Sequence, residues 1–333
     1  MRQITSLSFA LICLVSLGCS AQPTVVPTRV PSKSGKIRYF HLLNMDMRYV
    51  PTLMAMDALQ AEGYVVERIS LTTSALLADA LARGDADIAS FNNQTMWTAI
   101  SKGARARTFF QGIGSSGYIV AKQELKSCQE LDGRQIGMPA TTGLSPTLLD
   151  LFMKQNCPNS KPKFLLITDS PGREAALIAG QIDAGSFQLE ETMDVQRKAP
   201  GKFYVLSDQS KDFPQIVVQG LQWRQEWAAQ NPEMAKDFIR ALLEAHRRVN
   251  ENPQLLYDEG VRRLGLDPAI AKQVGDACLK SGMFDPNGGL MRGTIQSTLD
   301  LLANIQAIPA GLKPEDISDL SYLNAVLDEI GRK

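Results

Sequence analysis

The sequence of 333 residues contains little of what many enzymes and nucleic-acid-binding proteins use. It has only two histidines, His41 and His246, so a histidine-based triad or metal site has little to draw on. No P-loop, H-E-x-x-H, C-x-x-C or G-x-S-x-G motif occurs. Lysine plus arginine and aspartate plus glutamate are equal at 35 each, which excludes a basic field for nucleic acid and an acidic tail. We therefore expect no catalysis, no metal, no cofactor and no nucleic-acid partner.

The sequence also has no hydrophobic run long enough to span a membrane comfortably. The run from Leu7 to Leu17 has the length of the central region of a signal peptide. Gly18 and Cys19 follow it and are similar to the end of a bacterial lipobox, where the cysteine is lipidated and becomes the mature N-terminus. The alternative is ordinary signal cleavage near Ala21. We expect a signal peptide over 1–18 and a lipid anchor at Cys19.

Prolines recur every four residues after this point, at Pro23, Pro27 and Pro31. Such a stretch favours extended conformations and acts as a semi-rigid spacer. Residues 19–35 therefore predict a tether that holds a folded body off a membrane.

The remaining chain alternates short apolar runs with helical patterns, which predicts an α/β fold with mostly parallel sheets. A second βα series starts near Gln135, so we expect two lobes, the first formed by 36–120 plus 218–333 and the second by 121–217. From Trp223 the pattern is helical, and this tail is expected to pack on the first lobe. In the first series we expect helices at 51–62, 74–83 and 94–102, and strands at 37–42, 65–69, 87–90, 107–111 and 117–121. In the second series, strands are expected near 135, at 163–167 and at 181–187. Helices are expected to begin at Ser145-Pro146 and Ser170-Pro171, where each serine caps its helix and each proline takes the first helical position.

An internal repeat supports the two lobes. LARGDADIASF (81–91) and LIAGQIDAGSF (177–187) share Leu, Gly, Asp, Ser and Phe in the same register. Any βα unit can place Leu, Gly and Asp at such spacing, which is the alternative explanation. If the repeat is real, residues 92–95 of one lobe correspond to 188–191 of the other.

Three cysteines lie beyond the signal region. Cys128 precedes a predicted strand and Cys157 ends the helix after that strand, so both lie at the same pole of one βα unit. We expect a disulfide between Cys128 and Cys157, because an exported protein is folded where disulfides persist. Cys278 lies in an apolar context and is expected to be buried.

Ligands of open α/β sheets bind beyond the carboxyl ends of the strands, so the strand-to-helix loops give the candidate site. Most of these loops are rich in small hydroxyl, amide and glycine residues, which suit a small polar ligand. In the loop ATTGLSP, Ser145 is expected to cap a helix whose free N–H groups face the loop, which favours an oxyanion; plain capping without a ligand is the alternative. The candidate ligand-binding residues are Asp46, Arg48, Tyr49, Asn92, Asn93, Gln94, Thr95, Ser115, Ser116, Thr141, Thr142, Gly143, Ser145, Arg173, Gln188 and Glu190.

The charged candidates point to different ligand chemistries. Arg48 and Arg173 suit a carboxylate, sulfonate or phosphate, whereas Asp46 and Glu190 suit an amine; for each, a solvated surface position is the alternative. The run GIGSSG matches a dinucleotide fingerprint literally, but it leads into the strand-like YIVAK and not into a helix, which excludes that reading.

Over residues 35 to 333 the chain resembles the solute-binding lipoproteins of ABC importers for sulfonates, taurine, nitrate and thiamine pyrimidine precursors. The resemblance rests on the order and spacing of GDADIA, LKSCQELDGRQIGMP, GQIDA, NPEMAKDFIRALLEAHRRVNENP and DLSYLNAVLDEIG. It implies a type II periplasmic binding-protein fold, with crossovers near Ala121 and Val217. It also implies closure on a small-molecule ligand, an ABC permease and ATPase as partners, and a monomeric protein outside the cytoplasm.

Two other functions remain open at this point. A receptor that reports its ligand to a sensor would have the same sequence features. The resemblance also covers thiamine-pyrimidine synthases, which consume their own histidine and a pyridoxal cofactor. Those enzymes are intracellular and carry a cysteine-rich motif that this chain lacks, so we favour the importer.

Overall fold

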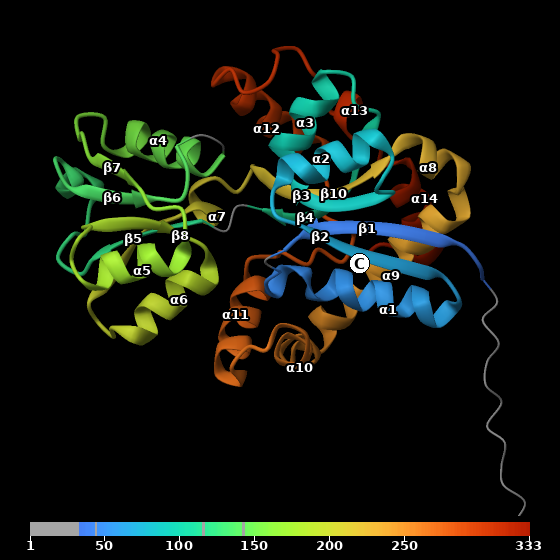
Figure 1. Cartoon of the computed structure of the whole chain (residues 1–333), viewed down its shortest axis with the longest axis horizontal. Coiled ribbons are helices and arrows are strands. Elements are labelled where there is room, and N and C mark those ends of the chain that lie inside the picture. Colours follow the sequence, from blue (N-terminus) through green and yellow to red (C-terminus); the bar gives the residue numbers. More distant parts are fainter. Residues whose placement is uncertain (1–32, 44, 115–116, 142–143) are drawn as a thin grey trace, which may run out of the picture. The chain divides into compact units, whose positions relative to one another are not determined.

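The computed structural model describes residues 33–43, 45–114, 117–141 and 144–333. Within them the chain forms two α/β lobes, each built on a five-stranded mixed sheet (Figure 1).

The sheet of the first lobe has the strand order β2-β1-β3-β10-β4. Strand β1 pairs in parallel with β2 and β3, and β10 runs antiparallel to β3 and β4. The strand bounds are β1 (Lys36–Leu42), β2 (Val65–Leu71), β3 (Ile88–Asn92), β4 (Ala106–Gly114) and β10 (Val217–Arg224).

The sheet of the second lobe has the order β7-β6-β8-β5-β9. Strand β6 is parallel to β7 and β8, and β5 is antiparallel to β8 and β9. The two sheets therefore have the same pattern, with β3 and β8 in equivalent places. The strand bounds are β5 (Tyr118–Lys122), β6 (Gln135–Met138), β7 (Lys163–Leu166), β8 (Ala184–Phe187) and β9 (Phe203–Asp208).

Helices cover both faces of each sheet. In the first lobe α1 and α9 lie on one face and α2 and α3 on the other; in the second lobe α4 lies opposite α5 and α6 (Figure 1). The helix bounds are α1 (Val50–Glu62), α2 (Ser74–Arg83), α3 (Asn93–Ser101), α4 (Leu144–Asn156), α5 (Ser170–Ile178), α6 (Leu189–Lys198), α7 (Gln209–Asp212), α8 (Gln225–Gln230), α9 (Pro232–Glu251), α10 (Pro253–Leu264), α11 (Pro268–Lys280), α12 (Arg292–Asn304), α13 (Pro314–Ile317) and α14 (Ser321–Ile330), with 3-10 turns η1 (Met47–Tyr49) and η2 (Cys128–Leu131).

Strand β1 shows why the first lobe has two cores. Successive side chains of a strand point to opposite faces. Accordingly Ile37 and Tyr39 belong to the core under α1 and α9, while Phe40 belongs to the core under α2 and α3.

The helical tail packs on the first lobe, with α9 against α1 and α14 against α9. The ring of Trp223 on β10 stacks on Phe109 of β4 with a centroid distance of 3.8 Å, and Tyr322 of α14 meets Trp223 edge-on at 5.1 Å. These aromatic contacts join the end of the chain to strands β10 and β4, at one side of the first sheet.

Three local expectations differ from the structure. Strand β5 pairs with β8 and β9, so the chain leaves the first sheet between Gly114 and Tyr118, before the expected Ala121. The apolar runs of β4 and β5 follow one another closely, and neither shows which sheet it joins. Helix α4 begins at Leu144, so Ser145 lies inside its first turn, and α5 is capped by Asp169 and not by Ser170.

The repeated aspartate has the same role in both lobes. Asp87, just before β3, accepts the backbone N–H of Arg38 at 3.0 Å and gives its own N–H to the carbonyl of Arg38. Asp183, just before β8, makes the same two bonds with Gln135 at the start of β6. Each aspartate also pairs with cations, Asp87 with the guanidinium of Arg38 at 2.6 Å and Asp183 with Lys122 at 2.7 Å.

We expect Asp87→Asn to lower the free energy of unfolding by about 3 kcal/mol, because it removes the buried carboxylate of an ion pair and leaves the guanidinium of Arg38 without its partner. Asp183→Asn should cost less, since the side chain of Asp183 is 17% exposed and that of Asp87 only 5%. Asp85→Asn is the control, because its side chain is 55% exposed. Urea unfolding of the three variants checks this order, and a cost at Asp85 as large as that at Asp87 would contradict it.

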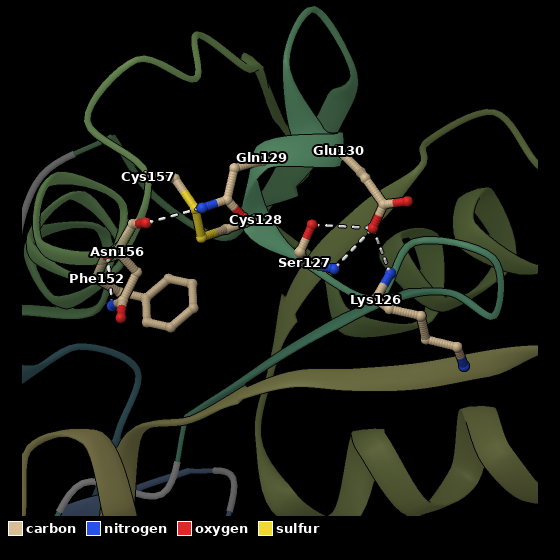
Figure 2. Close-up of a disulfide and its surroundings, with 8 residues drawn as sticks. All are labelled: Lys126, Ser127, Cys128, Gln129, Glu130, Phe152, Asn156 and Cys157. Atoms are coloured by element: carbon tan, nitrogen blue, oxygen red, sulfur yellow. Dashed lines mark hydrogen bonds between the residues drawn. A yellow bond between two sulfur atoms is a disulfide. The ribbon is translucent and has the colours of Figure 1, made fainter.

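A disulfide joins Cys128, at the start of η2, to Cys157, just after α4 (Figure 2). The Cα atoms are 5.8 Å apart, and the amide of Gln129 donates to the carbonyl of Asn156 beside them at 3.1 Å. On the other side of η2, Glu130 accepts the N–H groups of Lys126 and Ser127. Cys278 is a buried free thiol.

Replacing both bridged cysteines by serine should lower the free energy of unfolding by about 3 kcal/mol, through the freedom returned to the unfolded chain. The control is Cys278→Ala, which removes a free thiol without opening a loop and without burying a new hydroxyl. Mass spectrometry after alkylation of the unfolded, unreduced protein should leave Cys128 and Cys157 unmodified. Alkylation of both would show that the bridge does not form.

Candidate functional site

A cavity of about 510 Å³ lies where the strand-to-helix loops of the two lobes face each other. The first lobe contributes side chains from the start of α2 and from the β3–α3 junction, and the second lobe contributes the segment that leads into α4. The lining residues are Ser74, Asn92, Gln94, Thr95, Thr98, Ala140, Leu144, Ser145 and Pro146.

None of these nine lining residues carries a charge. Their polar groups are hydroxyls and side-chain amides, which can both donate and accept hydrogen bonds. Three helices, α2, α3 and α4, begin at the cavity with Ser74, Asn93 and Leu144. The free N–H groups and the positive dipole ends of these helices favour a ligand with negatively charged or partially negative oxygen atoms.

Local sequence explains how these side chains are held. Asn92 ends β3 and caps α3, and its side-chain oxygen accepts the N–H of Thr95 at 3.3 Å. Gln94 and Thr98 are four residues apart on α3, so they share one face of the helix. The hydroxyl of Ser145 lies 3.3 Å from that of Ser186, which is buried on β8.

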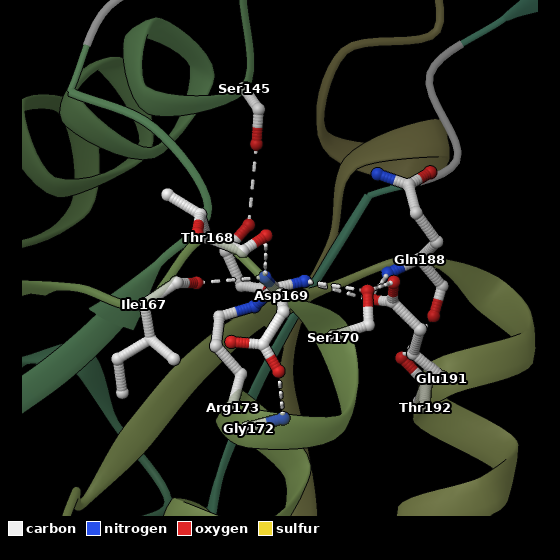
Figure 3. Close-up of polar contacts among 11 residues, drawn as sticks. Ser145, Ile167, Thr168, Asp169, Ser170, Gly172, Arg173, Gln188, Glu191 and Thr192 are labelled. Atoms are coloured by element: carbon white, nitrogen blue, oxygen red, sulfur yellow. Dashed lines mark hydrogen bonds and ion pairs between the residues drawn. The ribbon is translucent and has the colours of Figure 1, made fainter. Parts of the chain in front are cut away.

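Arg173 of α5 is a buried side chain beneath the loops of the second lobe (Figure 3). Its Nε donates to the carbonyl of Ser186 at 3.1 Å, and its Nη1 donates to the carbonyls of Ile167 and Thr168 at 2.9 and 3.2 Å. One guanidinium therefore ties the end of β8 to the loop after β7.

The other guanidinium nitrogen of Arg173 reaches α6. It lies 3.1 Å from a carboxylate oxygen of Glu191, and the same oxygen accepts the backbone N–H of Gln188 at 2.9 Å. The hydroxyl of Ser170 also donates to Glu191. Arg173 thus holds the loop ends in place. Its direct contact with an anion stays a prediction.

We expect Arg173→Gln to lower the free energy of unfolding by about 3 kcal/mol, because Glu191 would lose its buried partner. Arg173→Lys should recover little, since a lysine cannot reproduce the planar fork. Arg197→Gln on α6 is the control; its side chain is 59% exposed, and its loss should cost under about 1 kcal/mol. Equal urea midpoints for Arg173→Gln and Arg197→Gln would show that the buried arginine is not structural.

Arg48 is likewise engaged within the protein. Its Nε donates to both carboxylate oxygens of Asp46 at 2.8 Å, in the loop between β1 and α1. Burial lowers the pKa of Arg48, but the charge and the hydrogen bonds of Asp46, together with the charge of Glu190, raise that pKa by more.

Tyr49 belongs to a buried polar group beside this pair. The amide of Gln219 on β10 donates to the Tyr49 hydroxyl at 2.9 Å and to the hydroxyl of Ser90 at 3.3 Å. Burial, helped by the charge of Asp46, raises the pKa of Tyr49 to about 12. Gln219 is absent from the sequence-based candidates because it lies within a strand and not in a loop.

The structure brings only part of the candidate set together. Asn92, Gln94, Thr95 and Ser145 line the cavity, and a direct role of these residues with a ligand stays a prediction. The cavity also contains Ser74, Thr98, Ala140, Leu144 and Pro146, which the sequence-based set lacks. The spacing of Gln94 and Thr98, and the visible helix start at Thr73-Ser74, were the signals that could have found two of them.

Other candidates lie elsewhere. Asn93 is buried and accepts from the amide of Gln222 at 2.9 Å, Thr141 is exposed, and Gln188 caps α6. Asp46, Arg48, Tyr49 and Glu190 are not among the residues that line the cavity. Cys19, Ser115, Ser116, Thr142 and Gly143 lie outside the described residues.

Comparison with known proteins identifies a matching family and relatives of similar sequence. The family described as NMT1/THI5 like matches residues 59–255. A protein of Brucella abortus (strain 2308), named as a candidate binding protein, is 22% identical over 262 residues, which are 76% of this chain and 80% of that protein.

Two solved structures are similar in fold. The periplasmic sulfonate-binding protein SsuA of a candidate sulfonate ABC transporter from Methylobacillus flagellatus KT aligns with a TM-score of 0.70 and 15% identity, over 89% of this chain and 94% of that one. The periplasmic nitrate-binding protein NrtA from Synechocystis PCC 6803 aligns with a TM-score of 0.68 and 12% identity, over 90% and 89%.

The two equivalent sheets and these similarities establish the two-lobed α/β fold of type II periplasmic binding proteins. The chain belongs to the NMT1/THI5-like family, whose match covers more than half of its length. Within the described residues, no helix is both long enough and apolar enough to cross a membrane.

Proposed function

We propose that this protein is the solute-binding component of an ABC importer and that it captures a small polar or anionic organic molecule between its two lobes. The observation that carries the proposal is the cavity of about 510 Å³, to which both lobes contribute hydrogen-bonding side chains. A ligand held by both lobes stabilises their approach, which is how hinged binding proteins close.

The chemistry of the cavity supports an oxyanion or a neutral polar ligand. None of the lining residues that the structure describes is charged, and three helix starts supply positive partial charge. The two structural neighbours are named for sulfonate and for nitrate, both oxyanions. In this proposal the lobes move relative to each other where the chain passes between the two sheets, from β4 to β5 and from β9 to β10.

The family name also covers synthases, and the two histidines bear on that alternative. His41 faces the carbonyl of Leu42 at 2.8 Å, and His246 is buried against the carbonyl of Asp285 at 3.0 Å. Burial lowers the pKa of His246 to about 4. Neither histidine lines the cavity, which supports binding without turnover.

The proposal extends to the cellular setting. A lipid on Cys19 and the proline-rich tether would keep a monomeric receptor at the outer face of a membrane, where it meets a permease and its ATPase. These parts rest on the sequence of residues 1–35 and on the family.

We expect Gln94→Ala and Ser145→Ala each to weaken ligand binding about tenfold, the value of one lost hydrogen bond of roughly 1.4 kcal/mol. Thermal-shift screening with ethanesulfonate, nitrate, acetate and uracil selects the probe, and calorimetry measures its Kd. Gln254→Ala is the matched control, since this exposed glutamine of α10 lies outside the cavity.

Two results would contradict the proposal. One is a probe whose Kd is the same in the wild type and in both cavity variants. The other is chemical conversion of the probe by the purified protein, seen by NMR and lost in Ser145→Ala, which would indicate an enzyme.

A further inference from the structure

The two lobes also touch away from the cavity, at a place we call the α6–α11 junction. Helix α6 of the second lobe packs against α11 of the first, and α11 packs against η1, next to the Asp46 loop. Leu189 of α6 is part of the main core of the first lobe. The junction contains Asp46 and Arg48 from the β1–α1 loop, Glu190 from α6, Tyr118 from β5 and Cys278 from α11.

Glu190 lies in the first turn of α6 and faces the charges of the other lobe. Within the described part of the chain, its Oε1 atom is buried and has no hydrogen-bond partner. A buried carboxylate oxygen without a donor is costly when it is ionised and much less so when it is protonated.

The nearby cations do not match the charge of Glu190. Arg48 is held by both carboxylate oxygens of Asp46, and Arg173 is held by Glu191. With Glu190 ionised, Asp46, Arg48 and Glu190 together carry one net negative charge. With Glu190 protonated, they carry none.

The surroundings of Glu190 raise its pKa, as expected for a buried carboxylate without a matching cation. Burial and then the charge of Asp46 raise the pKa of Glu190 from 4.5 to about 7, although Arg48 acts in the opposite direction and lowers it. Burial also raises the pKa values of Cys278 and Tyr118. Glu190 is therefore the group of the junction that changes charge near neutral pH.

We propose that Glu190 is a proton-controlled latch between the lobes: when protonated it allows α6 to stay packed against α11 and the Asp46 loop, and when ionised it favours separation. The latch deepens the proposed function, because separation of the lobes would release a ligand held between them. It needs no ligand to operate.

The sign of the pH effect follows from linkage. Separation exposes Glu190 to water and returns its pKa toward 4.5, whereas contact holds the pKa near 7. The contact is therefore favoured fully below about pH 4.5 and loses that advantage as the pH rises through 7. Between these limits the ratio of joined to separated molecules should change on the order of 100-fold, at tenfold per pKa unit.

Small-angle X-ray scattering of the full chain without added ligand, from pH 5.5 to 8.5, tests the latch. The radius of gyration of the wild type should increase with pH, and Glu190→Gln should keep the low-pH value throughout. Glu233→Gln is the control, because Glu233 lies on the exposed surface of α9 with 80% of its side chain accessible, and it should behave as the wild type.

A second variant separates the charge effect from a packing effect. Asp46→Asn removes the charge that raises the pKa of Glu190 and leaves Arg48 to pair with the Glu190 carboxylate. The pKa of Glu190 in the joined lobes should therefore fall, and the radius of gyration should stay near its low-pH value up to pH 8.5. The latch is refuted if the wild-type radius is constant from pH 5.5 to 8.5, or if Glu190→Gln keeps the wild-type dependence. Because no ligand is used, either result leaves the proposed function untouched.

Discussion

The position of the cavity depends on the register that the two repeated aspartates set. Asp87 and Asp183 each accept a backbone N–H from the neighbouring parallel strand and donate their own N–H to the carbonyl of the same residue. Fixing the register of two parallel strands at one end also fixes it at the other end. The loops after β3 and β8 therefore leave their sheets at equivalent places. A slip of one residue would turn every side chain of the strand to the opposite face, and Ser90 and Ser186 would no longer lie where they do.

Much of the fold could be predicted from the sequence because its signals are local. Thr73 and Gly84 bound α2 as a side-chain cap and a residue with φ of 80°, and the register of the repeat could be read from Asp87 and Asp183. The expected correspondence of Asn92 with Gln188 holds in the structure, since both residues cap the helix after the equivalent strand. The sheet to which β5 belongs could not be predicted, because the sequence of an apolar strand does not show which distant strand it pairs with.

The site was harder to predict than the fold for a physical reason. A charged residue in a loop shows its chemistry in the sequence but not its partner. Arg173 is committed to the ends of β7 and β8 and to Glu191, and Arg48 is committed to Asp46. The position of Ser145 at the cavity could be predicted more easily, because a short side chain stays close to the helix start that carries it.

The charges that the sequence placed near the cleft are therefore distributed in a particular way. In the second lobe, Arg173 and Glu191 neutralise each other beneath the loops. At the α6–α11 junction, Asp46 and Arg48 neutralise each other, and Glu190 has no cation of its own. The cavity itself keeps uncharged side chains and helix starts. An anion bound by helix dipoles and neutral donors leaves no unpaired protein charge behind when the lobes separate. Such a ligand can therefore be both held and released. A full buried ion pair with the ligand would be harder to break, which suits a carrier less well than this arrangement.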